Sequence, residues 1–265
     1  MKKSNLINLP FKALLLFLFV AFSFRSFGAE KQQYYEIRIY HTTDNQQESR
    51  VEAYLKDAYI PALHRAGILK VGVFKPVESD NTSGKLIYLY IPFKTIEQYA
   101  SLPETLGKDK EYNEAGKSFV DADYSNFPYK RNESILLKAF MYMPEPAFPQ
   151  YSTPPSERIY ELRSYESATE AKALKKIEMF NEGGEIALFE SLKFNAVFYG
   201  EVVAGSSKPN LMYMTTFADM KSRDEHWKAF GDSPEWKKLS GLDEYKNTVS
   251  EIFRFLLHPT SYSDF

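Results

Sequence analysis

"YEIRIY" (residues 35–40) and "YELRSY" (residues 160–165) carry Tyr, Glu, Arg and Tyr at matching positions, 125 residues apart. The same offset aligns "VFK" (73–75) with "FYG" (198–200), and "LIYLY" (86–90) with "LMYMT" (211–215), without a gap. An offset that holds through several segments indicates two copies of one supersecondary unit. The sequence therefore predicts a duplicated fold.

The first copy has alternating and helical periodicities in a definite order. We expect a strand over 34–41, a helix from Val51 to Gly67 bent at Pro61, strands over 68–76 and 85–93, a helical region over 95–122 broken near Pro103 and Gly107, and a strand over 134–143.

The second copy repeats this order. We expect a strand over 158–165, a helix that opens with a capping box of Ser167 and Glu170, strands near 194–203 and 210–217, a helix from Asp219 to Phe230, a short helix capped by Ser233, and a strand over 251–258.

The order of elements in each copy thus predicts a ferredoxin-like βαββαβ unit of the α+β class. A four-stranded sheet with helices on one face leaves the other face bare, and two copies can cover each other there. We expect an intramolecular dimeric α+β barrel built from residues 29–143 and 157–265. Residues 144–156, which are rich in proline, are the expected linker.

The first 28 residues have the pattern of a secretory signal peptide. Lys2 and Lys3 precede an apolar run over residues 11–24, and Ser26 and Gly28 are small residues where a peptidase would cut. The run is shorter than the ~20 residues that a spanning helix needs. We expect a periplasmic or secreted chain without membrane contact; an uncleaved anchor is the alternative.

Composition argues against several classes of protein. The 265 residues include no Cys, so disulfides are excluded, and 33 Lys and Arg stand against 35 Asp and Glu. Residues 1–28 hold four basic residues and no acidic one, which leaves 29 against 35 and a mature net charge of −6. Without a basic cluster, no nucleic-acid partner is expected.

Strand alternation suggests a binding site. Successive side chains of a strand point to opposite faces. With Leu162 directed towards the helices, we expect Glu161, Arg163 and Tyr165 to line the barrel interior. The same parity adds Asn195, Tyr199 and Tyr213 from neighbouring strands. We interpret these six side chains as a ligand-binding lining in which Arg163 holds an anionic or hydroxyl-rich small molecule.

A purely structural role is the alternative. Glu161 and Arg163 stand two apart on one strand face, where a charge-paired, hydrogen-bonded network would only orient the two sheets. The helix segment "NEGGE" (181–185) also carries Glu182 and Glu185, which we expect on an exposed face.

Few residues suggest catalysis. None of the four histidines has an HxxxH, HxH or HExxH spacing, so no metal site is expected. His226, next to Trp227, is the candidate for proton transfer, with a structural role as the alternative. The sequence lacks Cys, G-x-S-x-G, Ser-x-x-Lys and P-loop patterns, so it indicates neither a nucleophile nor a nucleotide site.

Several segments resemble the NIPSNAP family. They are "YEIRIY", "YELRSY", "YIPALHRAGILKVGVFKP" (59–76) and "SRDEHWKAFGDSPEWKKL" (222–239). Arg223, Trp227 and the Pro-Glu-Trp of residues 234–236 match the family's pattern, whereas the first copy has Tyr99 and "KEY" (110–112) instead. The resemblance implies a dimeric α+β barrel of the secreted bacterial branch.

Three functions remain open from the sequence. The first is a small-molecule-binding barrel. The second is a cofactor-independent monooxygenase or isomerase, since proteins of similar fold include cofactor-free monooxygenases as well as haem enzymes. The third is a scaffold for self-association or partner binding, as a homo-oligomer for example. No cofactor is expected, with haem as a minor option.

Overall fold

A computed structural model describes residues 31–265. The predicted signal peptide therefore lies outside the described residues. Within them, no helix is long and apolar enough to cross a membrane.

The first half has the expected order of strands and helices. Its elements are β1 (Tyr34–His41), α1 (Asn45–Tyr54), the π-helix η1 (Leu55–Tyr59), α2 (Ile60–Arg65), β2 (Gly72–Pro76), β3 (Leu86–Phe93), α3 (Ile96–Lys108), α4 (Lys110–Ala115), α5 (Lys117–Val120) and β4 (Arg131–Ala139). The π-helix η1 ends at Tyr59, two residues before Pro61, which lacks an N–H donor. Pro103 lies inside α3, and the chain breaks instead at Asp109, which caps α4.

The second half repeats the pattern. Its elements are β5 (Ile159–Glu166), α6 (Glu170–Phe180), α7 (Glu185–Ser191), β6 (Ala196–Ala204), β7 (Asn210–Phe217), α8 (Met220–Asp232), α9 (Pro234–Ser240), the 3₁₀-helix η2 (Asp243–Tyr245) and β8 (Glu251–Pro259). The predicted capping box is wrong, because Thr169 caps α6 and the Ser167 hydroxyl donates to the Thr248 carbonyl. Ser233 caps α9 as expected.

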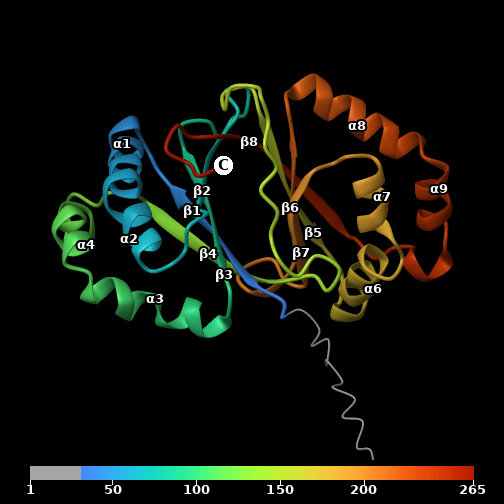
Figure 1. Cartoon of the computed structure of the whole chain (residues 1–265), viewed down its shortest axis with the longest axis horizontal. Helices are drawn as coiled ribbons and strands as arrows, with labels where there is room; N and C mark the ends of the chain where they lie inside the picture. Colours follow the sequence, from blue (N-terminus) through green and yellow to red (C-terminus); the bar gives the residue numbers. More distant parts are fainter. Residues whose placement is uncertain (1–30) are drawn as a thin grey trace, which may run out of the picture. The chain divides into compact units, whose positions relative to one another are not determined.

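The eight strands form one closed antiparallel barrel in the order β1-β3-β2-β8-β5-β7-β6-β4. Figure 1 shows the helices of the first half (blue to green) on one side of the strands and those of the second half (yellow to red) on the other. The predicted α+β barrel of two joined halves is confirmed.

The barrel interior is apolar, and the expected assignment of strand faces is wrong. Ile37 and Leu162 pack into one cluster shared by both halves, together with Tyr35, Phe74, Tyr90, Tyr160, Phe198, Met212, Met214 and others. Glu161, Arg163 and Tyr165 lie on the opposite face, beneath the helices of the second half. Both faces of these strands are buried, but the space between the two sheets is more closed to water than the space under the helices. A charged group without solvent would cost more free energy between the sheets, so the charged side chains lie on the helix-facing side.

The two halves are also not related by one constant offset. Ile37 pairs with Tyr90 of β3, and Leu162 pairs with Met214 of β7, so β3 and β7 are offset by 124 residues. Ile37 also pairs with Ile135 of β4, and Leu162 with Phe255 of β8, so these last strands of the two halves are offset by 120 residues. The ungapped alignment thus misassigns Tyr88, whose structural counterpart is Met212.

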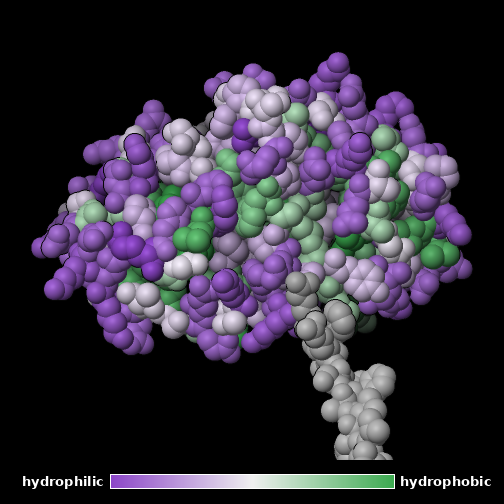
Figure 2. All heavy atoms as spheres, viewed as in Figure 1, coloured by the Kyte–Doolittle hydropathy of each residue, from purple (hydrophilic) through white to green (hydrophobic). Residues whose placement is uncertain are grey.

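A further hydrophobic cluster lies between sheet and helices in each half. The first contains Val51, Leu55, Leu63 and Leu89, and the second contains Phe180, Phe189, Tyr199, Tyr213 and Phe230. Figure 2 shows hydrophilic residues over the helices and hydrophobic ones gathered mainly between the two helical layers. The molecule thus has three apolar layers, and the charged cluster described below lies within the one under α8.

Candidate functional site

The centre of the site is the carboxylate of Glu161, which is fully buried on the helix-facing side of β5. It accepts four hydrogen bonds. One oxygen accepts from Arg163 Nε at 2.6 Å and Arg223 Nη2 at 3.2 Å. The other accepts from Arg223 Nε and from the indole Nε1 of Trp227, both at 2.7 Å. The four acceptor positions of one carboxylate are therefore filled by protein donors.

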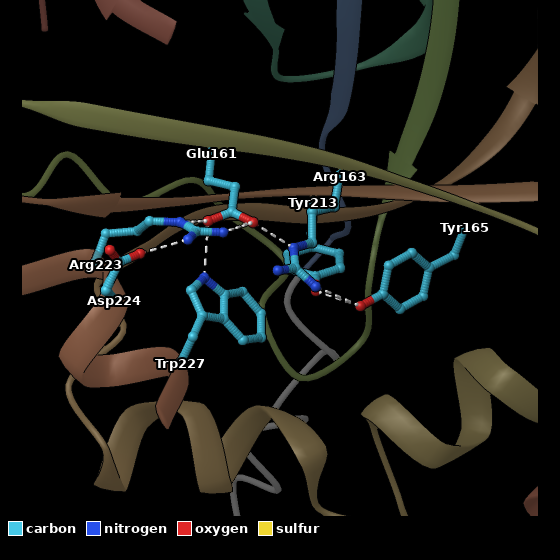
Figure 3. Close-up of polar contacts among 7 residues, drawn as sticks. All are labelled: Glu161, Arg163, Tyr165, Tyr213, Arg223, Asp224 and Trp227. Carbon is cyan, nitrogen blue, oxygen red and sulfur yellow. Dashed lines mark hydrogen bonds and ion pairs between the residues drawn. The ribbon is translucent and has the colours of Figure 1, made fainter. Parts of the chain in front are cut away.

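Helix α8 supplies two of these partners. Asp219 caps it by accepting a hydrogen bond from the Ser222 backbone N–H at 2.7 Å. Arg223 and Trp227 are four residues apart, so they lie one turn apart on the same face of the helix. Figure 3 shows both side chains extending from this helix to Glu161 on the strand. The cap thus fixes the start of the helix, and the helical repeat brings both donors to one carboxylate.

Arg163 links Glu161 to two tyrosines. Its guanidinium carbon lies 3.5 Å from the centre of the Trp227 ring, a close cation–π contact. Its Nη1 donates to the Tyr165 hydroxyl at 3.2 Å, and the Tyr165 and Tyr213 hydroxyls share a hydrogen bond of 2.8 Å. Figure 3 shows the resulting chain from Glu161 through Arg163 to the tyrosines. In the structure, Arg163 and Glu161 bind each other.

The charges hold Glu161 in its ionised form. Burial by itself raises the pKa of this carboxyl, but the hydrogen bonds and positive charges of Arg223 and Arg163 outweigh burial and bring the pKa below its ordinary value. A carboxylate of this kind is a poor proton acceptor at neutral pH. Its chemical role is to position two guanidinium groups and an indole.

An arginine without an ion-pair partner in the described residues lies beside the cluster. Arg254 of β8 pairs directly with Arg163 of β5, so both project from the same face of the barrel. No ion pair within residues 31–265 involves Arg254, which is exposed. Arg223 and Arg254 line a cleft of about 290 Å³ with Val77, Ser79, Asp80 and Leu256. Three arginines and three acidic residues thus meet here, but Arg163 and Arg223 are paired with Glu161 and Asp224, which leaves Arg254 beside Asp80 at the mouth of the cleft.

A second buried ion pair lies under the same helices. Lys176 Nζ donates to Glu185 at 2.6 Å, and both residues are almost inaccessible. The expected exposure of Glu185 is therefore wrong. Gly184 adopts a left-handed conformation (φ 89°) at the start of α7, which turns the chain so that Glu185 points inward. Burial raises the pKa of Glu185, and the charge of Lys176 opposes that shift.

The first half has a simpler equivalent. Arg38 donates to both oxygens of Glu36, at 2.9 and 3.1 Å, and the Ser134 hydroxyl donates to the same carboxylate at 2.7 Å. Ser134 pairs with Arg38 as Arg254 pairs with Arg163, so Ser134 stands where the second half has an arginine. The first half therefore has one guanidinium group for its carboxylate.

The structure brings together four of the six predicted lining residues. Glu161, Arg163, Tyr165 and Tyr213 form one hydrogen-bonded group, although beneath the helices and not inside the barrel. Tyr199 is buried against Tyr213, with ring centres 5.6 Å apart.

Asn195 lies apart from this group. It is exposed, precedes β6 with a φ of 46°, and donates to the Tyr151 hydroxyl at 2.8 Å. Asn195 is therefore not in the cluster.

His226 is also apart from the cluster. Its Nδ1 donates to the Ser222 backbone carbonyl at 2.6 Å, and its ring packs edge-on against Phe194 and Phe217. It does not line the cleft of Arg223 and Arg254. In the same part of the chain, no group of three or more His, Cys, Asp or Glu side chains could hold a metal ion.

Sequence reasoning missed the role of three residues in this cluster. Arg223 and Trp227 were recognised only as part of a resemblance, and Arg254 was not singled out. The spacing of four residues between Arg223 and Trp227 was the available signal in the sequence, since it places an arginine and an indole on one face of a helix. The contact with Glu161 spans more than 60 residues of sequence and follows only from the fold.

Comparison with known proteins gives a family match for the second half. The NIPSNAP family model matches residues 160–264, which include every member of the Glu161 cluster. No curated protein matches the chain significantly.

Solved structures share the fold of the whole chain. A candidate monooxygenase from Lactobacillus acidophilus is 11% identical, with 86% of this chain and 94% of that chain covered and a TM-score of 0.55. A candidate monooxygenase from Fusobacterium nucleatum is 9% identical, with coverage of 86% and 93% and a TM-score of 0.52. A NIPSNAP-like domain protein from Burkholderia xenovorans is 20% identical over 40% of this chain and 89% of its own, with a TM-score of 0.36. At such identities the first two structures show the dimeric α+β barrel fold alone.

Proposed function

We propose that this protein binds a small anionic molecule, of the carboxylate or phosphate class, in the cleft beside the Glu161 cluster. The observation that carries the proposal is Arg254, an exposed arginine of the cleft that is in no ion pair within residues 31–265 and whose counterpart in the first half is Ser134. Glu161 is shared by Arg163 and Arg223, and Arg254 adds a third guanidinium group on the same face. The corresponding carboxylate of the first half, Glu36, has only Arg38.

The geometry suits recognition of an anion. A guanidinium group presents donors in a planar fork that matches carboxylate and phosphate oxygens. Arg223 is held in place by Glu161 and by Asp224 at 2.6 Å, which fixes one wall of the cleft. Arg254 on the other wall is exposed, and an anion between them would be its counter-ion.

The proposal moves the predicted ligand from the barrel interior to the outer face. The middle of the barrel interior, where the predicted ligand would lie, is packed with aromatic and aliphatic side chains. Of the side chains predicted to bind the ligand, Glu161 becomes the support behind the cleft, where it orients Arg223. Both arginines of the cleft come from the same chain.

We infer two NIPSNAP-like halves in one chain, because β1 and β5 repeat the Glu-x-Arg pair and the barrel combines the two halves. We also infer that the protein acts in the periplasm or outside the cell, on the sequence pattern of residues 1–28.

Calorimetric titration with inorganic phosphate and with citrate at low ionic strength tests the proposal. Arg254→Gln removes a charge-assisted contact without touching the buried cluster, and we expect it to weaken binding roughly tenfold, or about 1.4 kcal/mol. Arg131→Gln, at an exposed arginine outside the cleft, is the matched control and should bind as the wild type does. If neither anion binds, or if both variants bind equally well, the cleft is not an anion site.

A further inference from the structure

One end of the barrel interior is hollow. A pocket of about 190 Å³ opens there between the ends of β1, β4, β5, β7 and β8. Its apolar wall comes from both halves and consists of Ile39, Ile135, Met212, Phe253 and Phe255. The opposite end of the interior is filled by Phe265, whose ring packs edge-on against Phe74, Tyr90 and the Phe148 ring of the linker.

Smaller residues of the second half account for the space. In the first half the interior pair at this level is Ile39 opposite Tyr88. In the second half the equivalent pair is Ser164 opposite Met212. A hydroxymethyl group and a flexible thioether thus stand where the first half has a branched aliphatic chain and an aromatic ring. The pocket follows from this difference between the halves.

The rim of the pocket is polar and acidic. Ser164 and Asn210 are buried and hydrogen-bonded to each other, so they satisfy their own polar groups. Glu133 and Glu166 also line the pocket, and no lysine or arginine does. Glu133 contacts His41 at 2.6 Å, whereas Glu166 is in no ion pair within residues 31–265. The rim therefore favours a cationic group over an anionic one.

The size of the pocket sets the ligand's size. An apolar cavity of about 150 Å³ in another protein accommodates benzene. A pocket of about 190 Å³ accordingly has room for a ring of that size and a short substituent.

We propose that this pocket binds a small amphipathic amine, with its aromatic or short aliphatic body against Met212 and Phe255 and its ammonium group at Glu166. The site is distinct from the arginine cleft, because Ser164 and Glu166 face the barrel interior while Arg163 faces the helices. The two sites prefer opposite charges.

Three probes with the same ring and different charges test the proposal, namely benzylamine, benzyl alcohol and benzoate, each titrated into the full-length protein and followed by NMR. We expect benzylamine to bind best, at millimolar or lower concentration, and benzoate worst. Glu166→Gln should lower the affinity for benzylamine roughly threefold and leave that for benzyl alcohol unchanged, since only the charge is lost. Glu114→Gln, at an exposed glutamate of α4 that does not line this pocket, is the control and should change neither.

A filling variant tests the pocket itself. Ile39→Phe places a larger side chain in the apolar wall, and we expect it to abolish binding of all three probes. The proposal is overturned if no probe binds the wild-type protein, if benzoate binds as tightly as benzylamine, or if Glu166→Gln affects the amine and the alcohol equally. The Glu166 readout does not depend on whether Ile39→Phe folds.

Discussion

Replacement of Glu161 by glutamine tests whether charge holds the site together. Glu161→Gln keeps the length of the side chain but removes the negative charge shared by Arg163 and Arg223. The Arg163 side chain is only 9% exposed, so water replaces little of the lost interaction. Loss of one partner of a buried ion pair typically costs about 3–5 kcal/mol. Because Arg223 is nearer to solvent, with its side chain 16% exposed, we expect a loss near the lower end, about 3 kcal/mol.

Glu36→Gln in the first half is the matched control. That carboxylate faces one guanidinium group, and the Arg38 side chain is 21% exposed. A hydrogen bond to a charged group contributes about 1.5–3 kcal/mol when it is well formed, and we expect a loss of about 1.5 kcal/mol for Glu36. Urea unfolding followed by circular dichroism compares the two variants. With an m value of about 3 kcal/mol/M, the midpoint should fall by about 1 M for Glu161→Gln and by about half as much for Glu36→Gln.

The double variant separates lost charge from lost hydrogen bonds. In the Glu161→Gln background, Arg163→Met removes one of the two uncompensated guanidinium groups, and it should recover part of the lost stability. The reasoning fails if Glu161→Gln costs less than about 1 kcal/mol. It fails equally if the cost does not exceed that of Glu36→Gln.

The pH dependence of stability is a second test of the Glu161 ion pairs. The folded pKa of Glu161 lies below that of the unfolded chain, which is about 4.3. A carboxyl of this kind stabilises the fold at pH values above the unfolded pKa, and this contribution disappears as the pH falls through the folded pKa. The difference in stability between the wild type and Glu161→Gln should therefore be constant between about pH 6 and 8 and shrink below about pH 4.

Two further predictions concern the helices over the site. Lys176→Met leaves the Glu185 carboxylate buried without its lysine partner, so we expect the free energy of unfolding to fall by a few kcal/mol at pH 8. The loss should diminish towards pH 5, where Glu185 takes up a proton, and urea unfolding at both pH values measures it. An equal loss at both pH values would contradict the assigned pairing. Gly184→Ala forces a side chain into a left-handed conformation (φ 89°) and should lower the stability by about 1 kcal/mol. Gly107→Ala lies in the last turn of α3 with open space around it and should raise the stability by roughly 0.5 kcal/mol. Equal shifts in melting temperature for the two variants would refute this.

The sequence predicted the elements of this fold more reliably than the faces of its strands. Alternation distinguishes the two faces of β5 but does not say which face is the barrel interior. In a barrel covered by helices both faces are buried, and here each carries tyrosines, for example Tyr160 on one and Tyr165 on the other. The apolar face is the one enclosed by the second sheet, because charged groups retain hydrogen-bond partners and some solvent at the edge of a helix.

The composition of the site was predictable only in part. Glu161, Arg163 and Tyr165 could be grouped from one strand, and Tyr213 was added from its neighbour. Asn195 was misplaced because β6 begins one residue later, at Ala196, after a backbone with positive φ. Arg223 and Trp227 reach Glu161 only through the packing of α8 against the sheet. That packing depends on all the side chains between them, so no local pattern contains it.

Strand β5 shows how one short segment can serve two independent sites. Arg163 and Ser164 are neighbours in sequence but project to opposite faces, one towards the arginine cleft and the other towards the barrel pocket. The charge at each site is likewise set by its own face, with Arg223 and Arg254 outside and Glu133 and Glu166 inside. Substitutions at Arg254 should therefore leave amine binding unchanged, and substitutions at Glu166 should leave anion binding unchanged. Cross-titration of the two variants with phosphate and benzylamine would reveal any coupling through the strand, and a change of more than about twofold in the opposite ligand would show that the two sites are not independent.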